Sequence, residues 1–290
     1  MGLLSDLPSI QKTLQSFARI ESMDSEDMPK PLLESQNDLQ QGRRLMLKVA
    51  VLYSGGKDSN RALHWALTHN LRVTHLVTMF PITKDSLMYH TPTLNLVELQ
   101  SQAIGIQLVK GQTTGVRAEE EVESLKLTLE PLDIEGLVTG ALESTYQKSR
   151  IDRVCETLGL RAFAPYWRCD LEKHLKETIH LGFEVIFVGV AALGLSENWL
   201  GRKLNLEALR DLLEIRRKYR INIGGEGGEY ETFVCDGPTF KCGIRFLNTK
   251  RIWDKKTESG YLEVSQAELV QKKGTITSTI DSRRFSTSGQ

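Results

Sequence analysis

The stretch LKVAVLYSGGKDSNRALHWAL, residues 47–67, decides the fold of this chain. Its first seven residues form a short apolar and β-branched run, which favours a strand buried on both faces. Its second half places Ala62, Leu63 and Ala66 at the spacing of one helix face. The segment SGGKDS, residues 54–59, therefore predicts a turn that leads from a buried strand directly into a helix.

This turn carries groups that suit the phosphates of a nucleotide. The N–H groups and the positive end of a helix meet there, which favours an anion. Two glycines let a phosphate approach the backbone closely, while the serines offer hydroxyls and the lysine a positive charge. The aspartate makes sense if a divalent cation accompanies the ligand. The predicted ATP-binding residues of the turn are Ser54, Gly55, Gly56, Lys57, Asp58 and Ser59, and the predicted Mg²⁺ ligand is Asp58.

The turn differs from two common glycine-rich loops. A P-loop, G-x-x-x-x-G-K-[ST], would need glycine at Val51 and Ser or Thr at Asp58. The dinucleotide-binding pattern G-x-G-x-x-G does not occur in the chain. A different class of nucleotide-binding loop is therefore expected.

Strands and helices alternate along the rest of the first half. This alternation favours βαβ units, with a parallel sheet and right-handed crossovers. In that plan a nucleotide lies outside the carboxyl ends of the strands. We therefore expect Met79, Phe80 and Gly140, at the ends of two later strands, to lie near the adenosine. The predicted strands are 47–53, 71–80, 106–111 and 134–142, and the predicted helices are 93–105 and 116–132.

The pattern changes after about residue 145 and predicts a smaller second α/β domain. The predicted helices there are 146–160, 171–183 and 205–219, and the predicted strands are 184–194, 241–256 and 260–269, the last two as edge strands. We expect four regions in all. They are an N-terminal extension of a short helix and a linker (1–45), an ATP-binding domain (46–145), a substrate-binding domain (146–268) and a disordered tail (269–290).

Composition limits the class of protein. Lys plus Arg and Asp plus Glu both number 37, so the formal net charge is zero, whereas a protein that binds nucleic acid usually has a basic surplus. The four cysteines form no C-x-x-C pair, which argues against a structural zinc. No apolar run approaches the roughly 18 residues of a membrane helix, and the N-terminus lacks a signal-peptide pattern. We expect a cytoplasmic protein with no direct nucleic-acid or membrane partner.

Several stretches resemble known enzymes. SGGKDS after a first strand resembles the PP-loop of the ATP pyrophosphatases, which holds the β- and γ-phosphates while an acceptor attacks the α-phosphate. Three longer stretches, LMYHTPTLNLVELQSQAIGI (87–106), VTGALESTYQKSRIDRVCETLGL (138–160) and GGEGGEYETFVCDGP (224–238), together resemble the compact form of the diphthine–ammonia ligases. The resemblance runs from about residue 46 to residue 265.

The resemblance implies a Rossmann-like α/β fold and a specific reaction. Members convert diphthine on translation elongation factor 2 to diphthamide with ATP, Mg²⁺ and ammonia, and release AMP and pyrophosphate. Adenylation makes the carboxylate oxygen a good leaving group, so no protein nucleophile is required. Lys57 directly, and Asp58 through the Mg²⁺ it would bind, are expected to neutralise phosphate charge. Many members have aspartate where Thr145 stands and arginine where Lys148 stands, so the roles of these two positions are open.

A second group of residues is expected to form the pocket for the modified histidine. Diphthine carries a quaternary ammonium, and such cations favour aromatic faces and carboxylates. Glu229 is the predicted catalytic group that binds ammonium or takes its proton, although a tight turn with solvated glutamates is the alternative. The predicted substrate-binding residues are His90, Trp167, Trp199, Glu226, Gly227, Gly228, Glu229, Tyr230 and Glu231, with Tyr166 beside them. Arg150 and Arg153 fit either phosphate binding or a surface ion pair.

Three other functions share parts of this pattern. A ligase acting on another carboxylic acid would use the same loop chemistry. A tRNA-modifying PP-loop enzyme would favour a basic face and catalytic cysteines, and a non-catalytic ATP sensor would leave ATP intact. The sequence leaves the oligomeric state open, a homodimer included.

Overall fold

The computed structural model describes residues 46–81, 96–113 and 118–272. The predicted N-terminal extension, His90 and the tail beyond residue 272 lie outside these ranges. Within them, the last strand continues to Gln271, so the segment expected to be disordered from residue 269 begins as regular structure.

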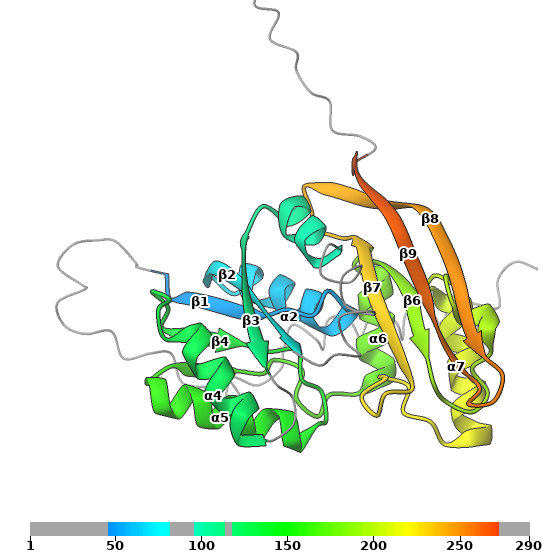
Figure 1. Ribbon diagram of the computed structural model, residues 1–290, viewed down its shortest axis with the longest axis horizontal. Helices are drawn as coiled ribbons and strands as arrows, with labels where there is room; N and C mark the ends of the chain where they lie inside the picture. Colours follow the sequence, from blue (N-terminus) through cyan, green and yellow to red (C-terminus); the bar gives the residue numbers. More distant parts are fainter. Residues whose placement is uncertain (1–45, 82–95, 114–117, 273–290) are drawn as a thin grey trace, which may run out of the picture. The chain divides into compact units, whose positions relative to one another are not determined.

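The first half forms a five-stranded parallel sheet (Figure 1), which confirms the predicted α/β fold. The strand order is β3-β2-β1-β4-β5. Its strands are β1 (Lys48–Leu52), β2 (Arg72–Pro81), β3 (Gln107–Thr113), β4 (Gly136–Val138) and β5 (Arg161–Phe163). The fifth strand was not predicted, and it carries the sheet beyond residue 145, where we expected the first domain to end.

Helices cover both faces of this sheet. One face packs against α2 (Lys57–Thr68) and the helical residues 96–104, and the other against α4 (Ala118–Leu129) and α5 (Thr145–Leu158). Strands β1 and β4 are adjacent, but the helix that follows β1 (α2) covers one face of the sheet and the helix that follows β4 (α5) covers the other. Such a switch point leaves a crevice at the carboxyl ends of the strands, where ligands of doubly wound sheets bind.

The second half forms an antiparallel sheet in the order β7-β6-β9-β8. Its elements are α6 (Leu171–His180), β6 (Glu184–Val190), η2 (Glu197–Trp199), α7 (Leu206–Tyr219), β7 (Tyr230–Asp236), β8 (Cys242–Asp254) and β9 (Ser259–Gln271). β8 is an edge strand as predicted, whereas β9 lies inside the sheet. The second part of the glycine-rich segment is strand β7, for which no strand was predicted, and Tyr230, Phe233 and Val234 are buried there.

The two halves share one hydrophobic core. Val51 and Leu63 of the first half belong to the same buried cluster as Phe187, Leu212 and Phe233 of the second. The contact reaches the predicted ATP loop itself, because the N–H of Val234 donates to the carbonyl of Gly55 at 3.1 Å. The second sheet therefore supports the loop through strand β7.

Gln100 strengthens this junction. Its side chain is fully buried, and its Nε2 donates to the carbonyls of Gly55 (2.9 Å) and Val234 (2.7 Å). A Gln100→Met substitution keeps the volume but removes both bonds, so we expect the free energy of unfolding to fall by about 1–3 kcal/mol. Urea denaturation measures it, with exposed Gln112→Met as the control. Equal stability of the two variants would contradict a bridging role.

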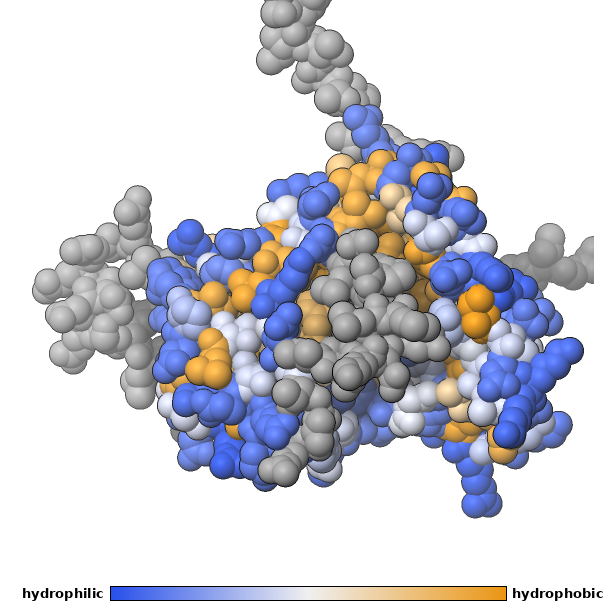
Figure 2. Space-filling view, in the orientation of Figure 1, coloured by the Kyte–Doolittle hydropathy of each residue, from blue (hydrophilic) through white to orange (hydrophobic). Residues whose placement is uncertain are grey.

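The visible face in Figure 2 is hydrophilic around its rim, with apolar residues gathered above its centre. Large exposed apolar side chains in the described ranges include Leu193, Leu247 and Leu269. No helix in those ranges has both the length and the apolar character needed to cross a bilayer.

Candidate functional site

A cavity of about 670 Å³ lies at the carboxyl ends of the parallel strands, facing the start of β7. This volume is within the roughly 300–1,000 Å³ range of small-molecule sites. The first half contributes the loop after β1, the ends of β2 and β3, the loop after β4 and parts of α4 and α5. The second half contributes Gly224, Gly225, Glu226, Gly228, Tyr230, Glu231 and Thr232. The cavity is therefore built by both halves.

The start of α2 gives one end of the cavity its affinity for an anion. Gly55 has φ +84°, which lets the chain turn sharply out of β1. Helix α2 begins after Gly56, which offers no side-chain cap. Thr232 accepts the N–H of Lys57 at 3.1 Å, and the N–H groups that follow in the first turn are available to other partners. A Cβ atom at Gly140 would lie 2.5 Å from the backbone carbon of Asp58, so only glycine lets the loop after β4 approach this helix end.

Lys57 is the buried cation at this end. Its side chain is 4% exposed, and Nζ contacts Asp58 Oδ2 at 2.8 Å and the Gly224 carbonyl at 2.5 Å. A lysine ammonium has three donors, so one remains for a ligand beyond these two bonds to the described residues. Burial alone would lower the pKa of Lys57, but the charge and hydrogen bond of Asp58, with the charge of Glu226, outweigh it and raise the pKa. The ammonium therefore stays charged.

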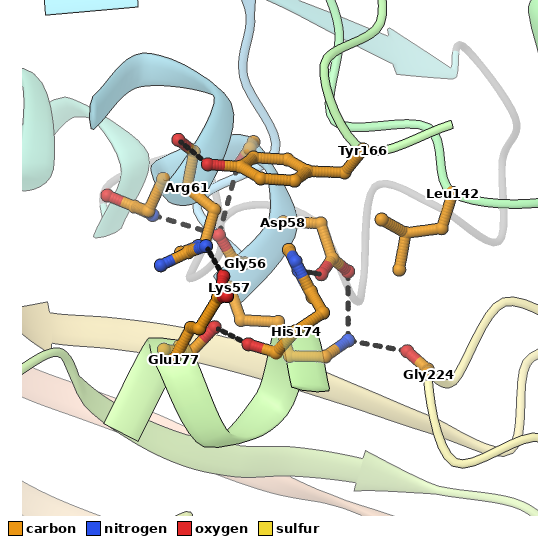
Figure 3. A network of polar contacts seen from close by, with 12 residues as sticks. Gly56, Lys57, Asp58, Arg61, Leu142, Tyr166, His174, Glu177 and Gly224 are labelled. Carbon is orange, nitrogen blue, oxygen red and sulfur yellow. Dashed lines mark hydrogen bonds and ion pairs between the residues drawn. The ribbon is translucent and has the colours of Figure 1, made fainter. Parts of the chain in front are cut away.

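Asp58 lies between two donors (Figure 3). Its Oδ2 meets Lys57, and its Oδ1 lies 3.0 Å from Nε2 of His174 on α6. Burial alone would raise the pKa of Asp58, but Lys57 and His174 outweigh this and hold the pKa below its usual value. The carboxylate is therefore ionised, and it links the two halves.

Apolar side chains form the cavity wall next to the loop. These residues are Leu52, Val77, Met79, Val122, Leu125 and Ile151. Of the three predicted adenosine neighbours, Met79 and Gly140 line the cavity, whereas Phe80, the next residue of β2 after Met79, does not. Arg150 lines it too, with Nε 3.3 Å from Glu121 Oε2, whereas the exposed Arg153 does not.

The three glutamates of the glycine-rich segment have different surroundings. Glu226 Oε2 accepts N–H bonds of 3.2–3.3 Å from Leu142, Glu143 and Ser144, so it ties the loop after β4 to the second half. Glu229 accepts N–H bonds from the backbone of its own segment on both oxygens, 3.1 and 2.8 Å long. The side chain of Glu231 lines the cavity, where it is partly withdrawn from solvent, and it has no side-chain hydrogen bond or ion pair within the described ranges.

Several predicted substrate residues do not reach the cavity. Glu229 and Gly227 do not line it, since Glu229 holds the turn that contains both. Trp199 is a core residue, 5% exposed, with its ring edge-on to Phe187 at 5.0 Å. Trp167 also lies outside the cavity lining, beneath the ammonium of Lys148.

Two aromatic predictions have different outcomes. Tyr230 lines the cavity, but its ring packs under the Lys57 ammonium at 5.0 Å and its hydroxyl donates to the Ile223 carbonyl. Burial raises the pKa of Tyr230 to about 12, so the hydroxyl stays protonated. Tyr166 packs instead against Arg61 and His174, outside the cavity lining.

Some residues of the site carried no signal in the sequence. Thr232 accepts the N–H of Lys57 at 3.1 Å, and Gly224, Gln100 and His174 contact the loop across gaps of 45 to 167 residues. Such contacts depend on how the second half of the chain packs against the loop, and a local sequence pattern does not predict this packing. The one hint in the sequence was that Gln100, Gly224 and Thr232 lie within the stretches that resemble the ligase family, and His174 lies outside them.

Comparison with known proteins agrees with this geometry. Residues 47–162 match the model of the diphthamide synthase N-terminal domain, and residues 170–270 match that of the diphthamide synthase C-terminal domain. The chain is 32% identical over 255 residues to diphthine–ammonia ligase of Mus musculus, covering 79% of this chain and 95% of the mouse protein. It is 33% identical over 217 residues to the Homo sapiens protein, covering 67% and 81%. A Schizosaccharomyces pombe relative is 33% identical over 238 residues, 75% of this chain and 39% of that longer protein.

A solved structure described as a predicted subunit of tRNA methyltransferase from Methanocaldococcus jannaschii aligns with 60% of this chain and 88% of its own, at 18% identity and a TM-score of 0.34. That likeness is too distant to bear on function. The two domain models and the relatives point to one assignment. The chain belongs to the diphthine–ammonia ligase family.

Proposed function

We propose that this chain converts diphthine on translation elongation factor 2 to diphthamide, using ATP and ammonia and releasing AMP and pyrophosphate. The observation that carries the proposal is the uncapped start of α2 beside a buried, charged Lys57 with one free donor, at one end of a cavity large enough for a nucleotide. Phosphates bind at such a helix end. The apolar wall around Met79 suits the adenine base.

The proposed chemistry has two steps. The diphthine carboxylate attacks the α-phosphorus, and the bond to the β-phosphate oxygen breaks to release pyrophosphate. Ammonia then attacks the activated carbonyl carbon, a C–N bond forms, and the C–O bond to AMP breaks. The Lys57 ammonium and the N–H groups that follow Lys57 in the first turn of α2 stabilise the negative charge that develops on the leaving pyrophosphate.

Mg²⁺ fits this site only together with phosphate. The described residues hold no group of three or more His, Cys, Asp or Glu side chains that could bind a metal. Mg²⁺ usually takes few protein ligands and several phosphate oxygens and waters. Asp58 is the protein group that would meet it, because each carboxylate oxygen retains a lone pair beyond its bond to Lys57 or His174. There Mg²⁺ would supply charge neutralisation.

For the ammonia step we propose Glu231 in place of Glu229. Glu229 is occupied by backbone N–H groups, whereas Glu231 faces the cavity without a partner in the described part of the chain. A free carboxylate at that place can hold ammonium or the quaternary ammonium of diphthine and can accept a proton from the attacking nitrogen. The described aromatic residues lining the cavity are Tyr53 and Tyr230.

The test mixes the purified chain with ATP, Mg²⁺, ammonium and elongation factor 2 bearing diphthine. We expect mass spectrometry to show acid converted to amide, with one AMP and one pyrophosphate formed for each event. Formation of ADP would contradict attack at the α-phosphorus. Pyrophosphate release with another carboxylic acid, but not with diphthine, would show that the enzyme is a ligase that acts on a different substrate.

The proposed place of action is the cytoplasm, and a homodimer stays an untested prediction.

A further inference from the structure

His174 connects the second half to the candidate ATP loop. It lies on α6 with 2% of its surface exposed, and its Nε2 is 3.0 Å from Oδ1 of Asp58. The ring of Tyr166 covers it, with ring centroids 4.7 Å apart. Figure 3 shows the imidazole and the Lys57 ammonium meeting opposite oxygens of one carboxylate. Asp58 is thus fixed from both sides.

Packing alone does not account for an imidazole at this place. Nδ1 of His174 is buried and has no hydrogen-bond partner among the described residues. A buried polar atom without a partner is less stable than an apolar group in the same space. Helix α6 has another contact with α2 in the same region, because Arg61 of α2 donates to Glu177 of α6 at 2.8 Å. What the imidazole adds is its bond to Asp58.

We propose that His174 is a positioning residue that fixes the Asp58 carboxylate so that Lys57 keeps one N–H directed at the phosphates. The bond from Nε2 orients Oδ1 toward His174 and away from Lys57, so the ion pair with Lys57 is a single contact of 2.8 Å through Oδ2. Without His174 the carboxylate is free to rotate and give both oxygens to the ammonium. Lys57 would then have no donor left for the nucleotide. The inference rests on the proposed function only in taking ATP as the ligand of this loop.

Three substitutions separate the hydrogen bond from the packing. In His174→Gln the amide nitrogen lies the same number of bonds from Cα as Nε2, so it can donate to Asp58. In His174→Asn the nitrogen lies one bond closer to Cα and falls short. His174→Leu fills the space without a donor. The bond to Asp58 therefore survives in the first variant and is lost in the other two.

The readouts are ATP affinity by titration calorimetry, kcat and KM for amide formation, and the melting temperature of the full chain. We expect the Asn and Leu variants to lose about 10–100-fold in ATP affinity or in kcat/KM, with the Leu variant at least as heat-stable as the parent. The Gln variant should retain most of both. In an Asp58→Ala background, His174→Leu should have little further effect, because the carboxylate that accepts from Nε2 is gone.

Two results would overturn the inference: no loss in the Leu variant, or equal losses in the Gln and Leu variants. The inference is also overturned if the variants lose ATP affinity only as far as their folded fraction falls, because the loss is then one of stability. If the parent protein binds ATP but forms no amide, the proposed function fails, while the ATP-affinity comparison still decides the role of His174.

Discussion

Replacing Lys57 with methionine is expected to lower ATP-dependent amide formation by about 10²–10³-fold, the usual effect of removing one preorganised charge partner from a reacting group. Lys57 is 4% exposed and is the cation at the start of α2, beside the Gly224 carbonyl and Asp58. Methionine fills similar space but leaves the phosphates without that charge. ATP affinity by titration calorimetry and the rate of AMP formation measure the effect.

The same substitution has a second consequence for stability. It leaves the largely buried Asp58 with His174 as its neighbour, and breaking such a pair costs up to about 3 kcal/mol. ATP affinity must therefore be expressed per folded molecule, with urea denaturation run in parallel. Lys203→Met is the matched control, since Lys203 forms an exposed pair with Glu184 that is worth less than about 1 kcal/mol. Normal ATP affinity in the Lys57→Met protein would place the phosphates elsewhere.

The ATP loop was predictable because its chemistry is local. Strand, turn and helix follow one another within residues 47–67, and the structure places Ser54, Lys57 and Asp58 in the cavity wall as that order requires. The alternation of apolar runs likewise predicted four of the five parallel strands. The fifth, Arg161–Phe163, is too short and too exposed to show a periodic pattern.

The substrate-binding residues were harder to predict, because glutamates close together in the sequence differ in where their side chains point. Glu229 and Glu231 look alike in the sequence, yet β7 begins at Tyr230 and separates them. Glu229 ends the turn and binds backbone N–H groups, while Glu231 projects from the strand into the cavity. Trp199 looked like part of a cation pocket, but an aromatic ring is also what a core needs, and composition cannot distinguish the two.

Glu231→Gln is expected to raise the ammonium concentration needed for half-maximal amide formation by about 100-fold, the lower range for loss of a general base. Glutamine cannot balance the charge of ammonium or accept its proton. The first step does not use ammonia, so exchange of labelled pyrophosphate into ATP should stay close to that of the parent. Glu229→Gln should instead alter the stability of its turn and leave the ammonium requirement largely unchanged. Glu207→Gln, an exposed change on α7, is the control.

Hydroxylamine tests the reason for that loss. It is mostly uncharged near neutral pH, whereas ammonia is mostly protonated, so hydroxylamine needs neither a carboxylate partner nor prior loss of a proton to attack the carbonyl carbon. Desolvation raises the pKa of Glu231, with Lys57 opposing and Asp58 adding to the shift, and a raised pKa makes the carboxylate a better base. The Glu231→Gln protein should therefore form hydroxamate at close to the parent rate while amide formation stays low. An equal loss with both nucleophiles would mean that Glu231 serves the acceptor or the loop and not the ammonia.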